Sequence, residues 1–356
     1  MLSPALYEVS ANPCAVLGPS DFGGQREENY QSGTQKALIK AAAQRANQSS
    51  GLRTNDAQRA QLLRSRLASQ KLLSEFLTGA GLDLKRLRTA QGPHSALQEG
   101  LVEKQKKAAL RSAARNRGKM QASIQKQRNA WLALAPQSDI FPNPSFTLDT
   151  PFLIWSTPFF LLEDSAAVPF GSWAKFDYET SQPSGEERVS FYFLWESPYT
   201  DYAVINAATS FSATGYLQAH APWSFWGNQS VVNAYAEFNV WIGFPNGSSP
   251  NASTEFFVGA IGALGQALTG SDTEGSSVST GLSMSDTLVA IPPRAAVFFE
   301  VALVLDYEVD DGGGHIQADF NSGDFEIACP VVVYSILNKP PEKANLLRAS
   351  LAKTSR

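Results

Sequence analysis

Apolar and polar residues alternate over residues 297–309, and this alternation constrains the fold more than any other feature of the chain. Apolar side chains stand at every odd position from Val297 to Val309, while Glu300, Asp306 and Glu308 lie at even positions between them. A period of two places successive side chains on opposite faces of a β-strand. The pattern therefore predicts a strand with one buried face and one polar face.

The residues that follow predict two further strands in the same sheet. Turn residues at 311–314 and at 322–323 separate this strand from two more alternating runs, which favours three adjacent antiparallel strands. In that register Asp306, Asp319 and Glu326 form a row of carboxylates about 5 Å apart. Such a row is unfavourable unless it is solvated, binds a cation such as Ca²⁺, or receives basic side chains from elsewhere in the chain. All three alternatives stay open, and no other cofactor is expected.

Shorter alternating runs fill most of the chain from residue 139 to residue 289. Gly, Pro, Asn and Ser separate them, and no helical pattern intervenes between most of them. Nine to eleven strands of this kind predict an all-β sandwich of two sheets, of jelly-roll or related type. The fold class of the whole chain is α+β, because the residues before the sandwich have a helical pattern.

The charges divide the chain into two unlike halves. Residues 1–135 contain 21 Lys and Arg against 9 Asp and Glu, whereas residues 136–356 contain 8 against 24. We therefore predict an irregular arm at 1–34, a basic helical module at 35–135, the sandwich at 136–338 and a basic tail at 339–356. The two halves are expected to differ in both fold and partners.

The helical module is predicted to contain a helix at 35–46 and two longer helices. Asn55 begins a run of leucines at helical spacing that ends before Gly79, and Ser95 with Gln98 has the spacing of a capping box for a helix reaching Leu134. We expect these two to pair as a hairpin or coiled coil. The last helix carries five basic residues three or four positions apart: Lys104, Lys107, Arg111, Arg115 and Lys119.

No catalytic motif is present. The three histidines lack metal-ligand spacing, the glycines of 259–265 are not followed by the Lys and Ser or Thr of a phosphate loop, and no nucleophile elbow is found. The chain is therefore interpreted as non-enzymatic.

Two other stretches suggest binding. Trp223, Phe225 and Trp226 are aromatic residues in a predicted loop, where they could stack on sugar rings or anchor a partner protein. Residues 256–268 are apolar and rich in small side chains, which suits either a buried strand or contact with a lipid bilayer. They are too short for a membrane-spanning helix.

These features favour a structural or interaction protein that forms homo-oligomers or binds other proteins, with the basic helices mediating assembly or docking. Three alternatives remain: a lectin-like sandwich that binds carbohydrate, a capsid-like shell protein, and a membrane-damaging toxin. The capsid alternative rests on layout, because a basic N-terminal region before a jelly roll resembles many viral shell proteins, whose arm meets nucleic acid. The N-terminal residues lack the pattern of a signal peptide, so we expect a cytoplasmic protein or one released without such a signal.

Overall fold

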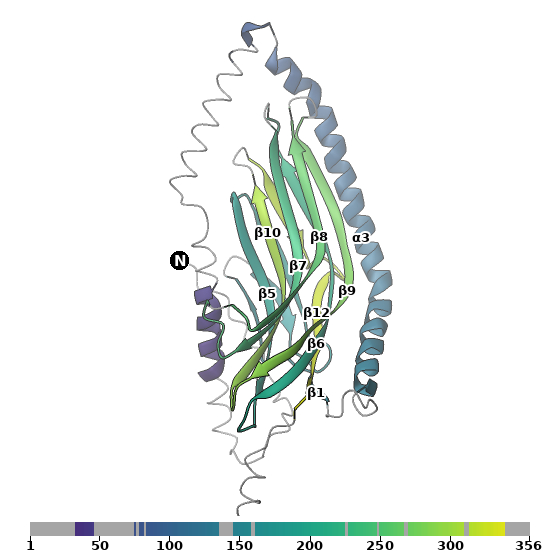
Figure 1. Ribbon diagram of the computed structural model, residues 1–356. Coiled ribbons are helices and arrows are strands. Elements are labelled where there is room, and N and C mark those ends of the chain that lie inside the picture. Colours follow the sequence, from purple (N-terminus) through teal and green to yellow (C-terminus); the bar gives the residue numbers. More distant parts are fainter. Residues whose placement is uncertain are drawn as a thin grey trace, which may run out of the picture.

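Two antiparallel β-sheets packed face to face form most of the described chain (Figure 1). The computed structural model describes residues 33–45, 75, 78–81, 83–134, 145–157, 161–224, 227–247, 249–266, 270–309 and 313–338. The predicted β-sandwich is confirmed, while the jelly-roll connectivity stays a prediction. The predicted N-terminal arm, up to residue 32, and the tail at 339–356 lie outside the described residues, and the domain boundaries stay predictions.

The larger sheet, sheet A, has seven strands among the described residues. In spatial order they are β1 (Ser145–Leu148), β12 (Glu326–Ile336), β4 (Trp173–Thr180), β11 (His315–Asp319), β6 (Ala203–Ala221) and β9 (Asp272–Ile291), with β3 (Leu161–Ala166) paired to β4. The smaller sheet, sheet B, has five. Their order is β2 (Leu153–Ser156), β5 (Ser184–Glu196), β10 (Ala296–Val309), β7 (Asn228–Ile242) and β8 (Ala252–Gly265).

The inner faces of the two sheets form one continuous core. Every odd-numbered residue of β10 from Val297 to Val309 is buried in it, as the alternation predicts. Sheet A contributes large side chains such as Phe211 and Phe320 to the same core. Each such residue stabilises the fold by about 1.5–3 kcal/mol relative to an exposed position.

The predicted three-stranded arrangement at 297–336 is wrong. Strand β10 lies in sheet B between β5 and β7, whereas β11 and β12 lie in sheet A and both pair with β6. The chain therefore changes sheet between β10 and β11 instead of forming a hairpin. Gly313 has a positive φ of 99°, and Gly314 packs so closely against Ser230 that a Cβ atom would clash with it. Glycines suit a tight hairpin and a sheet crossing equally, so the turn residues did not distinguish the two.

Helix α3 (Leu84–Leu134) is the long helix of the described chain. It begins well before Ser95, so the predicted capping box is wrong. The start follows a turn in which Gly81 has a φ of 86°. The backbone amide of Arg86 donates to the Asp83 carboxylate at 3.0 Å, which satisfies one of the free amides of the first turn.

Helix α3 packs against the outer face of sheet A. Its buried side chains are Val102, Ala109 and Ala113, which contact Tyr216 and Phe325 of the sandwich. The apolar side chains of Leu97 and Leu101 on the same helix are exposed. The predicted partner helix beginning at Asn55 lies largely outside the described residues. Sheet A therefore provides an apolar surface for α3, and the pairing of α3 with a second helix stays a prediction.

A second helix covers residues 33–45, close to the predicted helix at 35–46. Figure 1 shows it on the opposite side of the sandwich from α3. Its residues Leu38 and Ala42 pack on the outer face of sheet B, against Tyr192, Trp241 and Phe298. The described chain thus has four layers, namely helix 33–45, sheet B, sheet A and α3.

Candidate functional site: a buried ion cluster beneath helix 33–45

The outer face of sheet B carries a polar cluster centred on Glu300, a residue of β10 with no exposed surface. Because the odd-numbered residues of β10 point into the core, Glu300 points outward, toward helix 33–45. Its directly opposite neighbours are Tyr192 on β5 and Asn239 on β7. Strand pairing therefore places three polar side chains together.

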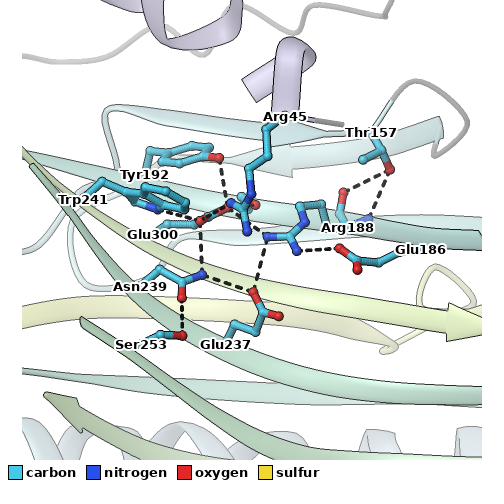
Figure 2. Close-up of polar contacts among 11 residues, drawn as sticks. Arg45, Thr157, Glu186, Arg188, Tyr192, Glu237, Asn239, Trp241, Ser253 and Glu300 are labelled. Atoms are coloured by element: carbon cyan, nitrogen blue, oxygen red, sulfur yellow. Dashed lines mark hydrogen bonds and ion pairs between the residues drawn. The ribbon is translucent and has the colours of Figure 1, made fainter. Parts of the chain in front are cut away.

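Six side chains donate hydrogen bonds to Glu300 among the described residues (Figure 2). The Oε1 atom accepts from Ser190 at 2.8 Å, Tyr192 at 2.9 Å and Arg188 at 3.4 Å. The Oε2 atom accepts from Arg45 at 2.8 Å, the Trp241 indole at 2.8 Å and Asn239 at 3.2 Å. Five of these donors belong to the sandwich, and Arg45 alone comes from helix 33–45.

Arg188 compensates the negative charge from within the sheet. It also binds Glu186 at 2.6 Å and Glu237 at 3.3 Å. Asn239 bridges Glu237 and Glu300, and its own amide oxygen accepts from Ser253 at 2.6 Å. The cluster is therefore held in place by strands β5, β7, β8 and β10 before any contribution from the helix.

The charges in the cluster are mutually stabilised. Burial alone would raise the pKa of Glu300, but the cations Arg45 and Arg188 and the hydrogen bonds from Ser190 and Trp241 hold this pKa well below its usual value. Burial alone would lower the pKa of Arg188, yet the nearby carboxylates, Glu300 first among them, raise it. Each group therefore favours the ionised form of the other.

The Arg45 side chain lies between the Glu300 carboxylate and the Trp241 ring. Its guanidinium carbon lies 4.6 Å from the ring centroid of Trp241, a cation–π geometry. Beside it, Ala42, Trp155, Thr157 and Tyr192 line a cavity of about 10 Å³, roughly enough for one water molecule. The Trp155 indole nitrogen is buried and has no hydrogen-bond partner among the described residues. The arrangement is suited to holding a planar cation.

The sequence analysis did not predict this cluster, although the sequence of β10 contains an indication of it. Glu300 was assigned to the polar face of the strand because it alternates with apolar residues. Yet Phe298, Ala302 and Val304 at neighbouring even positions are apolar as well. This indicates a strand covered on both faces, in which an acidic residue requires buried partners.

The predicted acidic row does not exist. Asp306 lies on sheet B opposite Glu186 and Asn233, whereas Asp319 and Glu326 lie on sheet A opposite Tyr216 and Thr214 respectively. The geometric basis for a Ca²⁺ site is therefore lost. Among the described residues, no group of three or more His, Cys, Asp or Glu is placed to hold a metal ion.

Two of the three carboxylates nevertheless contact α3. Lys106 forms an ion pair with Asp319 at 2.8 Å, and Arg117 pairs with Asp324 at 2.6 Å and with Glu326 at 3.6 Å. Burial would raise the pKa of Asp319, but hydrogen bonds from Lys106 and Ser322 lower it to about 2. These cations are not members of the predicted basic stripe. All five members of that stripe are exposed, namely Lys104, Lys107, Arg111, Arg115 and Lys119.

The predicted aromatic loop is described only in part. Trp223 is half-buried between β6 and β7, while Phe225 and Trp226 lie outside the described residues. The apolar stretch that begins at Phe256 forms the edge strand β8 up to Gly265. No helix in the described part of the chain is long and apolar enough to cross a membrane.

Neither a family model nor a curated protein sequence matches this chain. Among solved structures, it is similar to the enzymatically active domain of tailspike protein 4 of bacteriophage CBA120, with 8% identity and a TM-score of 0.21 over 56% of this chain and 19% of that one. It is also similar to the carbohydrate-binding module CBM27-1 of Caldicellulosiruptor saccharolyticus, solved with mannohexaose, with 12% identity and a TM-score of 0.20 over 49% and 93% of the two chains. The chain thus spans about a fifth of the tailspike domain. Similarity at this level assigns neither a family nor a ligand.

Proposed function

We propose that the chain is a non-enzymatic interaction protein that associates with further copies of itself along β8, the edge strand of sheet B. Strand β8 hydrogen-bonds to β7 on one side, and no other described strand of sheet B lies beyond it. An unpaired strand edge offers a row of backbone donors and acceptors to another chain. This open edge is the observation that carries the proposal.

The side chains of β8 support the same conclusion. Phe256, Phe257 and Leu264 are 37%, 60% and 44% exposed, and Glu255 is the one charged residue of the strand. Monomeric sandwiches usually protect an edge with several charges, a proline or a bulge. A register shift at Ala234/Tyr235 marks a bulge in the pairing of β8 with β7, and the Leu264 amide donates to the Asp272 carboxylate at 2.9 Å, but residues 259–263 between them are uncharged. Part of the edge is therefore suited to pairing with a second copy.

The basic helices support docking within the molecule. Lys106 and Arg117 of α3, together with Arg45, bind carboxylates of the acidic sandwich. The five exposed residues of the basic stripe remain available to an acidic partner, and nucleic acid stays an alternative partner for them. The lectin-like, capsid-like and membrane-damaging alternatives stay predictions without a specific supporting observation.

The proposal is tested by placing a charge on the edge strand. We expect Phe257→Lys to weaken self-association at least about tenfold, because two facing lysines repel one another and the apolar contact is lost. Sedimentation velocity from low to high micromolar concentration measures the change. Leu97→Lys is the matched control, since Leu97 is as exposed, at 68%, but lies on α3. If the wild-type chain is monomeric at every concentration, or if both variants behave alike, association through β8 is wrong.

A further inference from the structure

We propose that the outer face of sheet B is a receptor for an arginine-bearing helix, and that two copies of the chain exchange helix 33–45 through it. We call this surface the helix seat and define it by Trp155, Tyr192, Trp241, Phe298 and Glu300. The inference goes beyond association through β8 and does not depend on it.

The helix seat is complete without the helix. Glu300 keeps five donors from the sandwich, which are Arg188, Ser190, Tyr192, Asn239 and Trp241. Its carboxylate therefore stays fixed in direction when Arg45 is absent, and its Oε2 atom regains room for one donor. An anionic group held in this way beside an aromatic ring is a preformed site for a cation.

The geometry favours a guanidinium over an ammonium group. Arg45 places one nitrogen 2.8 Å from Glu300 while its guanidinium carbon lies 4.6 Å from the Trp241 ring centroid. A planar cation satisfies both contacts at once, whereas the compact ammonium of lysine does so less well. Leu38 and Ala42 lie at helical spacing from Arg45 and fill the apolar part of the helix seat. The helix seat thus recognises a helix whose apolar face ends in arginine.

The length of chain beside helix 33–45 allows the helix to reach a second copy. Residues 46–82 separate the helix from Asp83, the cap of α3, and a chain of that length can span on the order of 100 Å. A helix from another copy makes the same contacts as the resident helix, and it replaces the resident helix as the protein concentration approaches the effective concentration that the linker sets. A short helix of this kind is marginal alone and gains its stability from whichever helix seat it occupies.

The first experiment uses a labelled peptide of residues 33–45. The double variant Leu38→Asp/Arg45→Ala of the full chain, here called the open chain, is expected to release its helix from the helix seat. A carboxylate is unfavourable where Leu38 is buried, and the cation that binds Glu300 is removed. Fluorescence anisotropy measures binding of the peptide to this open chain. We expect the natural peptide to bind at least about tenfold more tightly than the same peptide with Arg45→Ala, and more tightly than it binds the wild-type chain.

The second experiment asks whether two full chains complement one another. The open chain is mixed with a differently tagged Trp241→Leu chain, which keeps its helix but loses the ring and one donor of its helix seat. Both carry Phe257→Lys, so that association through β8 does not contribute. We expect the two chains to co-purify. As a control, neither chain should retain a differently tagged copy of itself. Adding Arg45→Ala to the Trp241→Leu chain should abolish the co-purification.

Circular dichroism melting first establishes that each variant folds. If the open chain does not melt cooperatively, the peptide titration is repeated on the single variant Arg45→Ala. Equal binding of the two peptides, or no binding of either, overturns the proposal. So does a failure of the complementary chains to co-purify when both are folded. A failure of association through β8 alone leaves these results unchanged, which separates the two proposals.

Discussion

Glu300 is a fully buried charge whose partners come from β5, β7 and helix 33–45. Truncating one partner side chain removes a donor, while the other members of the cluster still surround the carboxylate. Replacing one member of a buried ion pair is costly because the other charge stays desolvated.

We therefore expect Glu300→Gln to lower the free energy of unfolding by about 3–5 kcal/mol. The change leaves Arg45 without its carboxylate, while Arg188 keeps Glu186 and Glu237. Urea unfolding followed by circular dichroism measures the loss. Glu186→Gln is the control. Glu186 also binds Arg188, but its side chain is 42% exposed, and we expect the free energy of unfolding to fall by less than about 1 kcal/mol. Similar losses in the two variants contradict the central role of Glu300.

Residue patterns in the sequence predicted which side chains enter the core, but not which polar side chains meet. The odd positions of β10 were correct because a period of two is a local property of the strand. The cluster of Arg45 with Glu300 joins residues 255 positions apart, and no local pattern encodes such a contact. The apolar even positions Phe298, Ala302 and Val304 were the local indication that this face is covered.

At the scale of elements, α3 is held on sheet A by small apolar contacts and by a series of polar ones. Among the residues that the structure describes, the buried apolar side chains are Val102, Ala109 and Ala113. Polar contacts with the sandwich come from Gln98, Val102, Gln105, Lys106 and Arg117.

Lys106→Ala tests this arrangement. We expect the variant to lose about 2 kcal/mol, because the half-exposed Lys106 forms a charge-assisted hydrogen bond with the buried Asp319. Hydrogen exchange of α3 should increase more than that of the strands. Lys107→Ala, one position along and exposed, is expected to change stability by less than about 0.5 kcal/mol. The interpretation fails if the two lysines have equal effects.

Element types were easier to predict than element partners. Strands and helices follow from periodicity within a dozen residues, so β10 and the helix reaching Leu134 were found. Their neighbours depend on loops, and the crossing at Gly313 and Gly314 was taken for a hairpin. On α3 the leucines at 97 and 101 are exposed whereas Ala109 and Ala113 are buried, so hydrophobicity alone does not identify the face that packs on the sheet.

At the scale of the whole molecule, each outer face of the sandwich has a carboxylate bound by the helix that covers it. Burial tends to raise the pKa of both Glu300 and Asp319, but Arg45 and Lys106 lower them, and that of Asp319 falls to about 2. A carboxylate whose pKa is lower in the folded chain than in the unfolded chain stabilises the fold at pH values above its unfolded pKa. This stabilisation is lost as the pH falls through the folded pKa.

Acid should therefore loosen both helices. For Asp319 the loss runs from about pH 4 to about pH 2 and amounts to about 2 kcal/mol, and for Glu300 it extends lower. Urea unfolding between pH 6 and pH 2 measures the profile of the wild-type chain and of Asp319→Asn. We expect the variant to have the flatter profile in that range, while Glu179→Gln, an exposed change, follows the wild type. Parallel profiles for all three chains contradict the assignment.

The opposite charges of the two halves were evident from the sequence, and they were the basis for expecting the basic helices to meet the acidic sandwich. Which cations take part could not be predicted, because Lys106 and Lys107 are equivalent until the helix has a defined rotation.

The separation between Arg45 and Glu300 also bears on synthesis. The helix leaves the ribosome first, and its carboxylate is added 255 residues later. At typical elongation rates of about 5–20 residues per second, the interval is on the order of 10–50 s. Throughout it the nascent chain carries an excess of 12 positive charges in residues 1–135 with its main acidic counterpart still unmade. The positive charges of such a chain attract polyanions, and completion of the sandwich supplies the carboxylates that bind Arg45, Lys106 and Arg117 within the molecule.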